Sequence, residues 1–383
     1  MSARCVRKIG IVIICCVIVG AFSGSYAQMR LTPEPEGPVQ FQSSRTCAKC
    51  HLDIHRIWKE SLHARALEDN IFQSAFMMAI KQEGDQVRSV CLGCHAPTTL
   101  ITGDMLIEQS ITSEAITCDF CHRLSNIHPA AGPVAITSGE EKYGPLPSQE
   151  LADSHPTVYS ETFKKSDFCA TCHQWTNRHG IAILDTYREW SQGPHPAKGV
   201  HCQDCHMPLV KGAVAAGAEK GGMINSHDLA GGHSITQVAS AAEVKVVSVT
   251  RVASGIRAVV EVSNVGSGHM VPTGMPSRAL ALEVDLLDAK GAVVERQEYV
   301  FKKTVLDSEY NELTSDADLI LNGAIITKDN RIPPGGSISI PFDFAAAPKK
   351  SYSVSAHLRY RYNPLILQEE QISIDMGADV KSL

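Results

Sequence analysis

The chain has 383 residues, enough for two domains of ordinary size, and a formal net charge of −6 at pH 7. Its first 27 residues hold three basic side chains and no acidic ones, so their removal would leave a charge of −9. This acidic balance argues against nucleic acid or an anionic membrane surface as a partner.

The N-terminus has the pattern of a secretory signal. Basic residues precede an apolar run from Ile9 to Val19, and Ala27 ends a small-x-small cleavage site. The run is short for a membrane span, although a retained single-helix anchor is the alternative. We therefore expect a signal peptide at 1–27 and a flexible leader at 28–44, which is rich in Pro, Gly, Glu and Gln.

Ten of the 13 cysteines lie beyond the signal, and they fall into five C-x-x-C-H motifs. The thiols are Cys47 and Cys50, Cys91 and Cys94, Cys118 and Cys121, Cys169 and Cys172, and Cys202 and Cys205, and the motif histidines are His51, His95, His122, His173 and His206. This spacing lets two thiols reach both vinyl groups of one haem while the histidine ligates its iron. Disulfides and zinc half-sites are the alternatives. Five repeats with no thiol left over favour five covalent haems c.

The segment between the first two motifs predicts a helix that carries His63. Its apolar residues at helical intervals are Ile54, Ile57, Trp58, Leu62 and Ala66. Gly84-Asp85 ends this segment. A later stretch from Pro129 to Pro147, rich in Gly, Pro and Ser, predicts a long ordered loop.

The first and fourth motif regions echo each other. Trp58 precedes His63 by five residues, as Trp190 precedes His195, and each pair follows a similar C-A-x-C-H motif. The echo predicts a duplicated haem-packing unit, with convergence on the needs of haem contact as the alternative.

The composition changes after Ser240. Short runs with β alternation are punctuated by Gly, Asn, Asp and Pro; they lie at 244–249, 256–262, 280–286, 293–301, 337–340 and 352–362. They predict an immunoglobulin-like β-sandwich without the usual cysteine pair. The expected fold class is a multidomain α+β protein, with a mainly helical, loop-rich pentahaem domain at 45–240 and the sandwich at 241–383.

Eleven of the 16 histidines lie outside the motifs and are available for the sixth iron position. The candidates are His63, His195, His227, His233, His269 and His155. His227 and His233 lie in a Gly-rich loop that can approach a haem edge closely. His269 lies in a tight Gly/Pro loop between two strands and would tie the two domains together. A methionine such as Met207 or Met223 is the alternative ligand at one haem.

Several motifs in combination resemble the cytochrome c-552/c-554-like multihaem cytochromes. They are W-x-x-S-x-H-A at Trp58–Ala64, T-C-D-F-C-H at Thr117–His122, Y-R-E-W at Tyr187–Trp190 and G-V-H-C-Q-D-C-H-M-P at Gly199–Pro208. The loop at Gly268–Gly274 resembles one in secreted multihaem proteins with a C-terminal β-domain. The resemblance implies mostly bis-histidine haems in stacked pairs, and it supports the six candidate histidines above as ligands. The tetrahaem member of the family lacks the sandwich, so its haem order does not transfer.

Together these features predict a periplasmic or extracellular electron carrier without catalytic residues. Its expected partners are redox proteins of the cell envelope, a membrane-anchored quinol oxidase or conduit, and further copies of itself. One alternative is a reductase of a small nitrogen or sulfur oxyanion with one open haem, although every motif here ends in His and not in Lys. The other is a subunit of a cytochrome conduit or filament.

Overall fold

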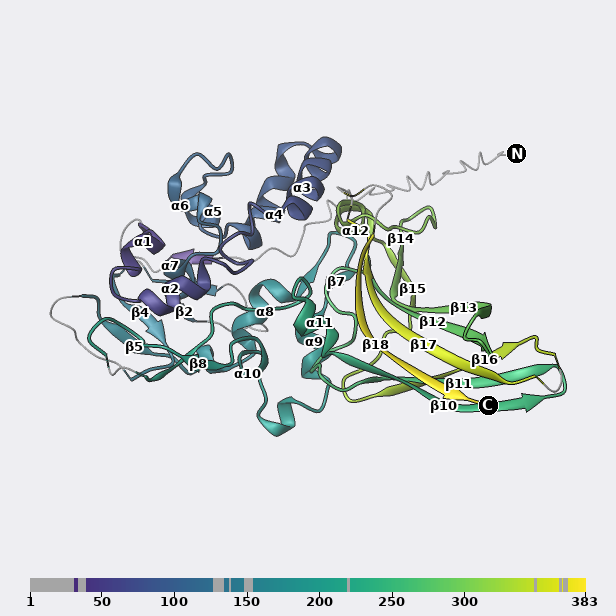
Figure 1. Ribbon diagram of the computed structural model, residues 1–383. Coiled ribbons are helices and arrows are strands. Elements are labelled where there is room, and N and C mark those ends of the chain that lie inside the picture. Colours follow the sequence, from purple (N-terminus) through teal and green to yellow (C-terminus); the bar gives the residue numbers. More distant parts are fainter. Residues whose placement is uncertain are drawn as a thin grey trace, which may run out of the picture.

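The computed structural model describes residues 31–33, 39–126, 134–137, 139–147, 154–218, 221–347, 350–364, 367 and 371–383. The expected signal peptide lies outside these residues, as do parts of the expected leader and of the loop from Pro129 to Pro147. Short helices dominate the chain up to Ala239, and long strands follow from Ala242 (Figure 1). Within the described ranges, every helix is too short or too polar to cross a membrane.

The N-terminal part consists of short helices and small sheets joined by turns. Its helices are α1 (Ser44–Cys47), α2 (Leu52–Trp58), α3 (Asn70–Glu83), α4 (Arg88–His95), α5 (Thr99–Thr102), α6 (Ser110–Ser113), α7 (Cys118–Cys121), α8 (Asp167–His173), α9 (Thr186–Ser191), α10 (Cys202–His206) and α11 (Ile235–Ala239), with 3₁₀ turns η1 (Asp85–Val87), η2 (Glu161–Lys164) and η3 (Pro196–Lys198). Its strands are β1 (Leu31–Pro33), β2 (Leu124–Asn126), β3 (Val134–Ile136), β4 (Lys142–Gly144), β5 (Thr157–Tyr159), β6 (Trp175–Thr176), β7 (Ala182–Leu184), β8 (Leu209–Lys211) and β9 (Met223–Asn225).

The C-x-x-C-H motifs lie in the helices of this part. The motifs of α4, α8 and α10 end at the last helical residue, which is the motif histidine in each case. Residues three apart lie on one face of a helix, so a helical C-x-x-C presents both thiols to the same side. The first motif differs, because α1 ends at Cys47 and His51 caps the start of α2.

The helix predicted to carry His63 is shorter than expected and ends at Trp58. The buried Trp58 donates from Nε1 to the carbonyl of Ile116 (3.2 Å), and the buried Ser61 hydroxyl accepts from the Ala64 N–H (3.3 Å). A serine that bonds to the nearby backbone competes with helical hydrogen bonds. His63 therefore lies in a turn, where the helical pattern of Leu62 and Ala66 is not continued.

The C-terminal part consists of long antiparallel strands in two main sheets. The strands are β10 (Ala242–Val252), β11 (Gly255–Asn264), β12 (Arg278–Asp288), β13 (Val293–Phe301), β14 (Lys303–Leu306), β15 (Ile325–Asp329), β16 (Ser337–Phe344), β17 (Tyr352–Tyr362) and β18 (Ile372–Ser382), with α12 (Asp316–Asn322) between β14 and β15. One sheet has the order β10-β11-β16 and the other β13-β12-β17-β18. All six predicted β runs fall in these strands, whereas β14, β15, β18 and α12 were not predicted.

The main apolar core lies between these two sheets. Alternate residues of β11, among them Ile256, Val260 and Val262, are fully buried and meet buried residues of β12 such as Leu282. Two apolar clusters of the described N-terminal part have four and three buried members, and a third cluster of four is shared with α12. That part therefore has little apolar side-chain core of its own.

The sandwich differs from a constant-type immunoglobulin domain in one strand. Without the β14–β15 hairpin, its first, second and fifth strands form one sheet, and the fourth, third, sixth and seventh form the other. In a constant-type domain the fourth strand belongs to the first sheet. The immunoglobulin-like type therefore stays a prediction, as does the expected domain boundary at 240/241, near which β10 begins.

The two parts contact each other through α12. Ala317 and Leu321 of this helix pack with Ala79 of α3 and Val87 of η1. Asn177 also donates from Nδ2 to the carbonyl of Gly323 (2.7 Å). Figure 1 places α3 and α12 side by side at this junction.

Candidate haem-attachment and metal sites

The motif cysteines lie close together across motifs. The thiols of three pairs lie close enough to shift each other's pKa: Cys47 and Cys118, Cys94 and Cys172, and Cys169 and Cys202. The contact with Cys169 lowers the pKa of the Cys202 thiol to about 7. Thiols from motifs far apart in the sequence are thus gathered into one region.

Four of the five motif histidines are oriented by a backbone carbonyl. The contacts from Nδ1 are His51 to Val214 (2.6 Å), His95 to Ala66 (3.4 Å), His122 to Tyr143 (2.7 Å) and His206 to Ala230 (2.6 Å). A carbonyl oxygen can only accept, so Nδ1 carries the proton and Nε2 keeps its lone pair. This is the tautomer that a metal-ligating histidine needs, held by the partner that such ligands usually have.

Three of the candidate sixth ligands use Nδ1 in the same way. His155 contacts the carbonyl of Pro156 (3.2 Å), His227 that of Asn225 (2.9 Å) and His269 that of Met270 (2.9 Å). The Nε2 atoms of His155 and His227 are therefore also available as acceptors, and that of His269 has only a long contact with Ser267 Oγ (3.4 Å).

Three candidates face a motif histidine across a fixed gap. The ring centroids are 6.2 Å apart for His51 and His155, 6.3 Å for His63 and His173, and 6.4 Å for His206 and His269. A metal about 2 Å from the nitrogen of each ring would separate the two centroids by about 6 Å. The rings are too far apart to stack directly and are at the separation that a shared iron requires. The residues therefore fit a bis-histidine iron centre.

The remaining two motif histidines have less direct partners. Burial lowers the pKa of His122 to about 4, and the nearby His227 contributes to this shift. The carboxylate of Asp69 influences both His95 and His233, which places these two rings near the same group. Phe72 stacks on His95 with centroids 3.8 Å apart.

The buried histidines are neutral at pH 7. Burial, as the largest cause, lowers the pKa of His63 to about 3 and that of His173 and His269 to about 4. It does so because an apolar surrounding disfavours the charged imidazolium. A neutral imidazole is the form that binds a metal, so no proton has to be displaced.

His195 faces no motif histidine ring in the described part of the chain. Its ring lies against the loop that carries His269, where a Cβ on Gly268 would be 3.4 Å from His195 Cγ and 3.4 Å from Trp190 Cδ1. Its Nδ1 is buried without a hydrogen-bond partner. The role of His195 as an iron ligand therefore stays a prediction.

The loop that carries His269 is held against the N-terminal part by buried polar contacts. Arg331 donates from Nη1 to the carbonyl of Pro272 (3.1 Å) and forms an ion pair with Glu189 of α9 (2.7 Å). The Thr273 hydroxyl donates to Glu189 Oε2 (2.6 Å). The sequence did not indicate these residues, because a buried ion pair between distant segments has no local pattern.

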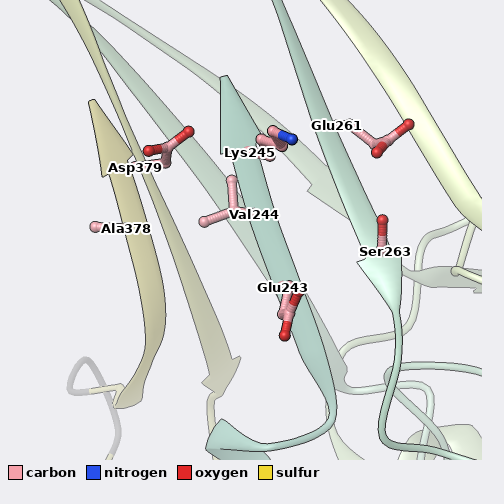
Figure 2. A pocket seen from close by; sticks show the side chains of 7 residues that line it. All are labelled: Glu243, Val244, Lys245, Glu261, Ser263, Ala378 and Asp379. Carbon is pink, nitrogen blue, oxygen red and sulfur yellow. The ribbon is translucent and has the colours of Figure 1, made fainter. Parts of the chain in front are cut away.

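A separate surface depression of about 330 Å³ lies on the sandwich. It is formed by β10, β11 and β18 and lined by Glu243, Val244, Lys245, Glu261, Ser263, Ala378 and Asp379 (Figure 2). None of these side chains is a histidine or cysteine, so the depression is not part of the candidate metal sites.

Comparison with known proteins supports the resemblance found in the sequence. Residues 46–123 match the family of cytochrome c554 and c-prime. The structure is similar to that of a pentahaem cytochrome c552 from Thermochromatium tepidum, with a TM-score of 0.71 and 23% identity over 91% of this chain and 100% of that chain. The resemblance to multihaem c-type cytochromes is confirmed. Because 91% of the chain is covered, the similarity in fold includes the sandwich as well as the multihaem cytochrome part.

Other matches add little. A putative β-galactosidase from Bacteroides fragilis is similar over 38% of this chain and 16% of that chain, at 12% identity, but its TM-score of 0.20 carries no argument. No curated protein matches the sequence.

Haem c, which the comparisons support as the cofactor of a multihaem cytochrome, supplies an iron that takes up and releases one electron. The residues described above would hold it: paired thiols bind the ring, and histidine Nε2 atoms ligate the metal. The carbonyl partners of Nδ1 fix the orientation of each imidazole. With two histidines at the iron, such a site would favour electron transfer over the binding of a substrate.

Proposed function

We propose that the chain is a periplasmic or extracellular electron carrier with five covalent haems c, mostly with two axial histidines. The observation that carries this proposal is the set of three facing histidine pairs with centroids 6.2, 6.3 and 6.4 Å apart. The proposal also includes a secretory signal at 1–27. It further includes an immunoglobulin-like sandwich whose fourth strand lies in the other sheet than in a constant-type domain.

In our assignment each iron has two ligands from this chain, which leaves the predicted ligand His195 without an iron. The pairs are His51 with His155, His95 with His233, His122 with His227, His173 with His63, and His206 with His269. The first, fourth and fifth pairs are supported by their ring separation. The other two are supported by electrostatic proximity: His227 influences His122, and Asp69 influences both His95 and His233.

The contacts between thiols of different motifs support an order for electron transfer. The Cys47 motif lies beside the Cys118 motif, and Cys121 influences both thiols of the Cys169 motif. The Cys169 motif in turn contacts Cys202 through one thiol and Cys94 through the other. Electrons would pass from the Cys47 site through the Cys118 site to the Cys169 site, where the path divides. Partners at either end would be redox proteins of the cell envelope or further copies of the chain.

The test combines mass spectrometry, electron paramagnetic resonance and one histidine variant. We expect the purified protein to carry five haems on a chain that begins near Gln28, and all ferric haems to be low-spin. His269→Ala should convert one haem to a high-spin ferric form, because that iron loses an axial ligand. His357→Ala is the matched control, since His357 lies in β17 and contacts the hydroxyl of Ser355 (3.1 Å). A wild-type protein with a substantial high-spin signal would instead favour a reductase with an open haem.

A further inference from the structure

A buried donor group on the sandwich has no acceptor within the described protein. Tyr360 is only 5% exposed, yet its hydroxyl makes no hydrogen bond. Nε of Arg278 is also buried without a partner, and its guanidinium makes one long hydrogen bond, from Nη1 to the carbonyl of Thr273 (3.4 Å). Unpaired buried donors are costly and rare in native proteins, so two of them at one place need an explanation.

The two donors share one face at the end of the sandwich. Arg278 begins β12 and pairs with Tyr362 of β17, and Tyr360 lies two residues away on the same face of β17. The guanidinium lies over the Tyr362 ring, 5.8 Å from its centroid. This end of the sheet adjoins α12, which contacts the N-terminal part (Figure 1).

The neighbouring carboxylate is already committed elsewhere. Asp316 accepts from the Tyr362 hydroxyl through Oδ2 (2.5 Å) and from the Ser277 hydroxyl through Oδ1 (2.5 Å). Tyr362 and Ser277 are thus satisfied within the protein, whereas Tyr360 and Nε of Arg278 are not. The contrast between two tyrosines on one strand face indicates that the missing acceptor is not among the described residues.

Two glycine loops close over the arginine. A Cβ on Gly232 or on Gly274 would lie 2.8 Å from Arg278 Nη1, and a Cβ on Gly232 would lie 3.5 Å from the Tyr360 hydroxyl. Gly232 directly precedes His233, and both His233 and His173 are influenced electrostatically by Arg278. The donors therefore lie beside the sites of the Cys91 and Cys169 motifs.

We propose that Arg278 and Tyr360 form a carboxylate-binding site that receives a propionate of the haem attached at the Cys91 or the Cys169 motif. The assignment rests on the haem attachment in the proposed function. An arginine guanidinium presents several N–H donors in a fixed planar arrangement and, with a tyrosine hydroxyl, matches the oxygens of a carboxylate. A soluble oxyanion has similar oxygens, and the experiment separates the two sources. The sandwich would thus bind the cofactors by a charge contact as well as through His269.

The arginine would also set the reduction potential of that haem. Ferric iron gains one electron to become ferrous iron and loses one unit of positive charge. A guanidinium nearby favours the less positive ferrous state. Loss of the arginine charge should therefore lower the midpoint potential of one haem.

The experiment is a spectroelectrochemical titration of the haem-loaded, full-length protein and its variants. We expect Arg278→Gln to lower the reduction equilibrium constant of one haem about tenfold, which corresponds to about 59 mV for one electron. Tyr360→Phe, which removes only the hydroxyl, should shift the same haem in the same direction by less. Resonance Raman spectra of both variants should show a changed propionate bending band. Two matched controls should leave the potentials unchanged: Tyr362→Phe, whose hydroxyl bonds to Asp316, and Arg359→Gln, whose guanidinium pairs with Glu283.

Three results would overturn the assignment. The first is a full haem complement in both variants with unchanged potentials and propionate bands. The second is an equal shift in the two controls. The third is a saturable response of the wild-type potential to inorganic phosphate that Arg278→Gln abolishes, because the donors would then bind a soluble anion. Failure of the proposed function gives a different result, since mass spectrometry of the wild-type protein would then show no covalent haem.

Discussion

The buried ion pair between Arg331 and Glu189 should contribute strongly to the attachment of the sandwich to the haem-bearing part. Arg331 is 5% exposed and Glu189 is 8% exposed. Arg331 also holds Asp329 through two nitrogens, at 2.8 and 2.7 Å. The perturbation is Arg331→Met, which keeps much of the side-chain volume but leaves both carboxylates without their cation.

The expected magnitude follows from distance and burial. Two unit charges 2.7 Å apart attract each other by about 6 kcal/mol at an effective dielectric of 20. Desolvation of both groups offsets much of this attraction, but removal of one partner of a buried pair still costs about 3–5 kcal/mol. We expect Arg331→Met to lower the free energy of unfolding by that amount. Glu189→Gln should cost less, about 1–3 kcal/mol, because the amide oxygen can still accept a hydrogen bond.

The assay is chemical denaturation of the haem-loaded protein, followed by haem absorbance and far-ultraviolet circular dichroism. Arg257→Met is the control, because Arg257 pairs with Asp343 on the exposed surface of the same sandwich. The free energy of unfolding of this control variant should change little. A loss below about 1 kcal/mol for Arg331→Met would refute the reasoning, since a buried pair would then behave like an exposed one.

Two further predictions concern the N-terminal part. Burial by itself would raise the pKa of Asp104, but hydrogen bonds from Thr112, Glu108 and Gln109 hold this pKa below its usual value. The carboxylate therefore stabilises the fold above the unfolded pKa of about 3.9, and this contribution is lost as pH falls through the lower folded pKa. Unfolding curves of Asp104→Asn between pH 2 and 7 should show a weaker acid dependence than wild type, and an unchanged slope would contradict the assignment. In a haem-free chain, we expect limited proteolysis to digest residues before about 240 and to leave the sandwich, which has the main apolar core; equal protection of both parts would oppose this.

The local features of the fold were accessible from the sequence, because they depend on near neighbours. Alternating residues such as Val260 and Val262 predicted a strand, and β11 contains them. The C-x-x-C-H spacing predicted paired thiols, and α8 and α10 place them on helices. The end of α2 at Trp58 was missed, since it depends on the contact with Ile116, 58 positions away.

The partners of the motif histidines could not be predicted in the same way. His155 meets His51, and His269 meets His206, through contacts between segments far apart in the chain. His195 shows the limit of local reasoning. Its spacing from Trp190 repeats that of His63 from Trp58, yet only His63 faces a motif histidine within the described structure. A repeated spacing reproduces local geometry but not the distant residue that completes the pair.

The thiol contacts between motifs also have a consequence for biogenesis. Cys47 lies against Cys118, Cys94 against Cys172 and Cys169 against Cys202. In an oxidising compartment, neighbouring free thiols become disulfides. Even transient folding of the N-terminal part before its cysteines were modified would bring these wrong partners together and could cross-link them. Folding and attachment would then compete in time, and their order would decide whether the protein matures or is trapped.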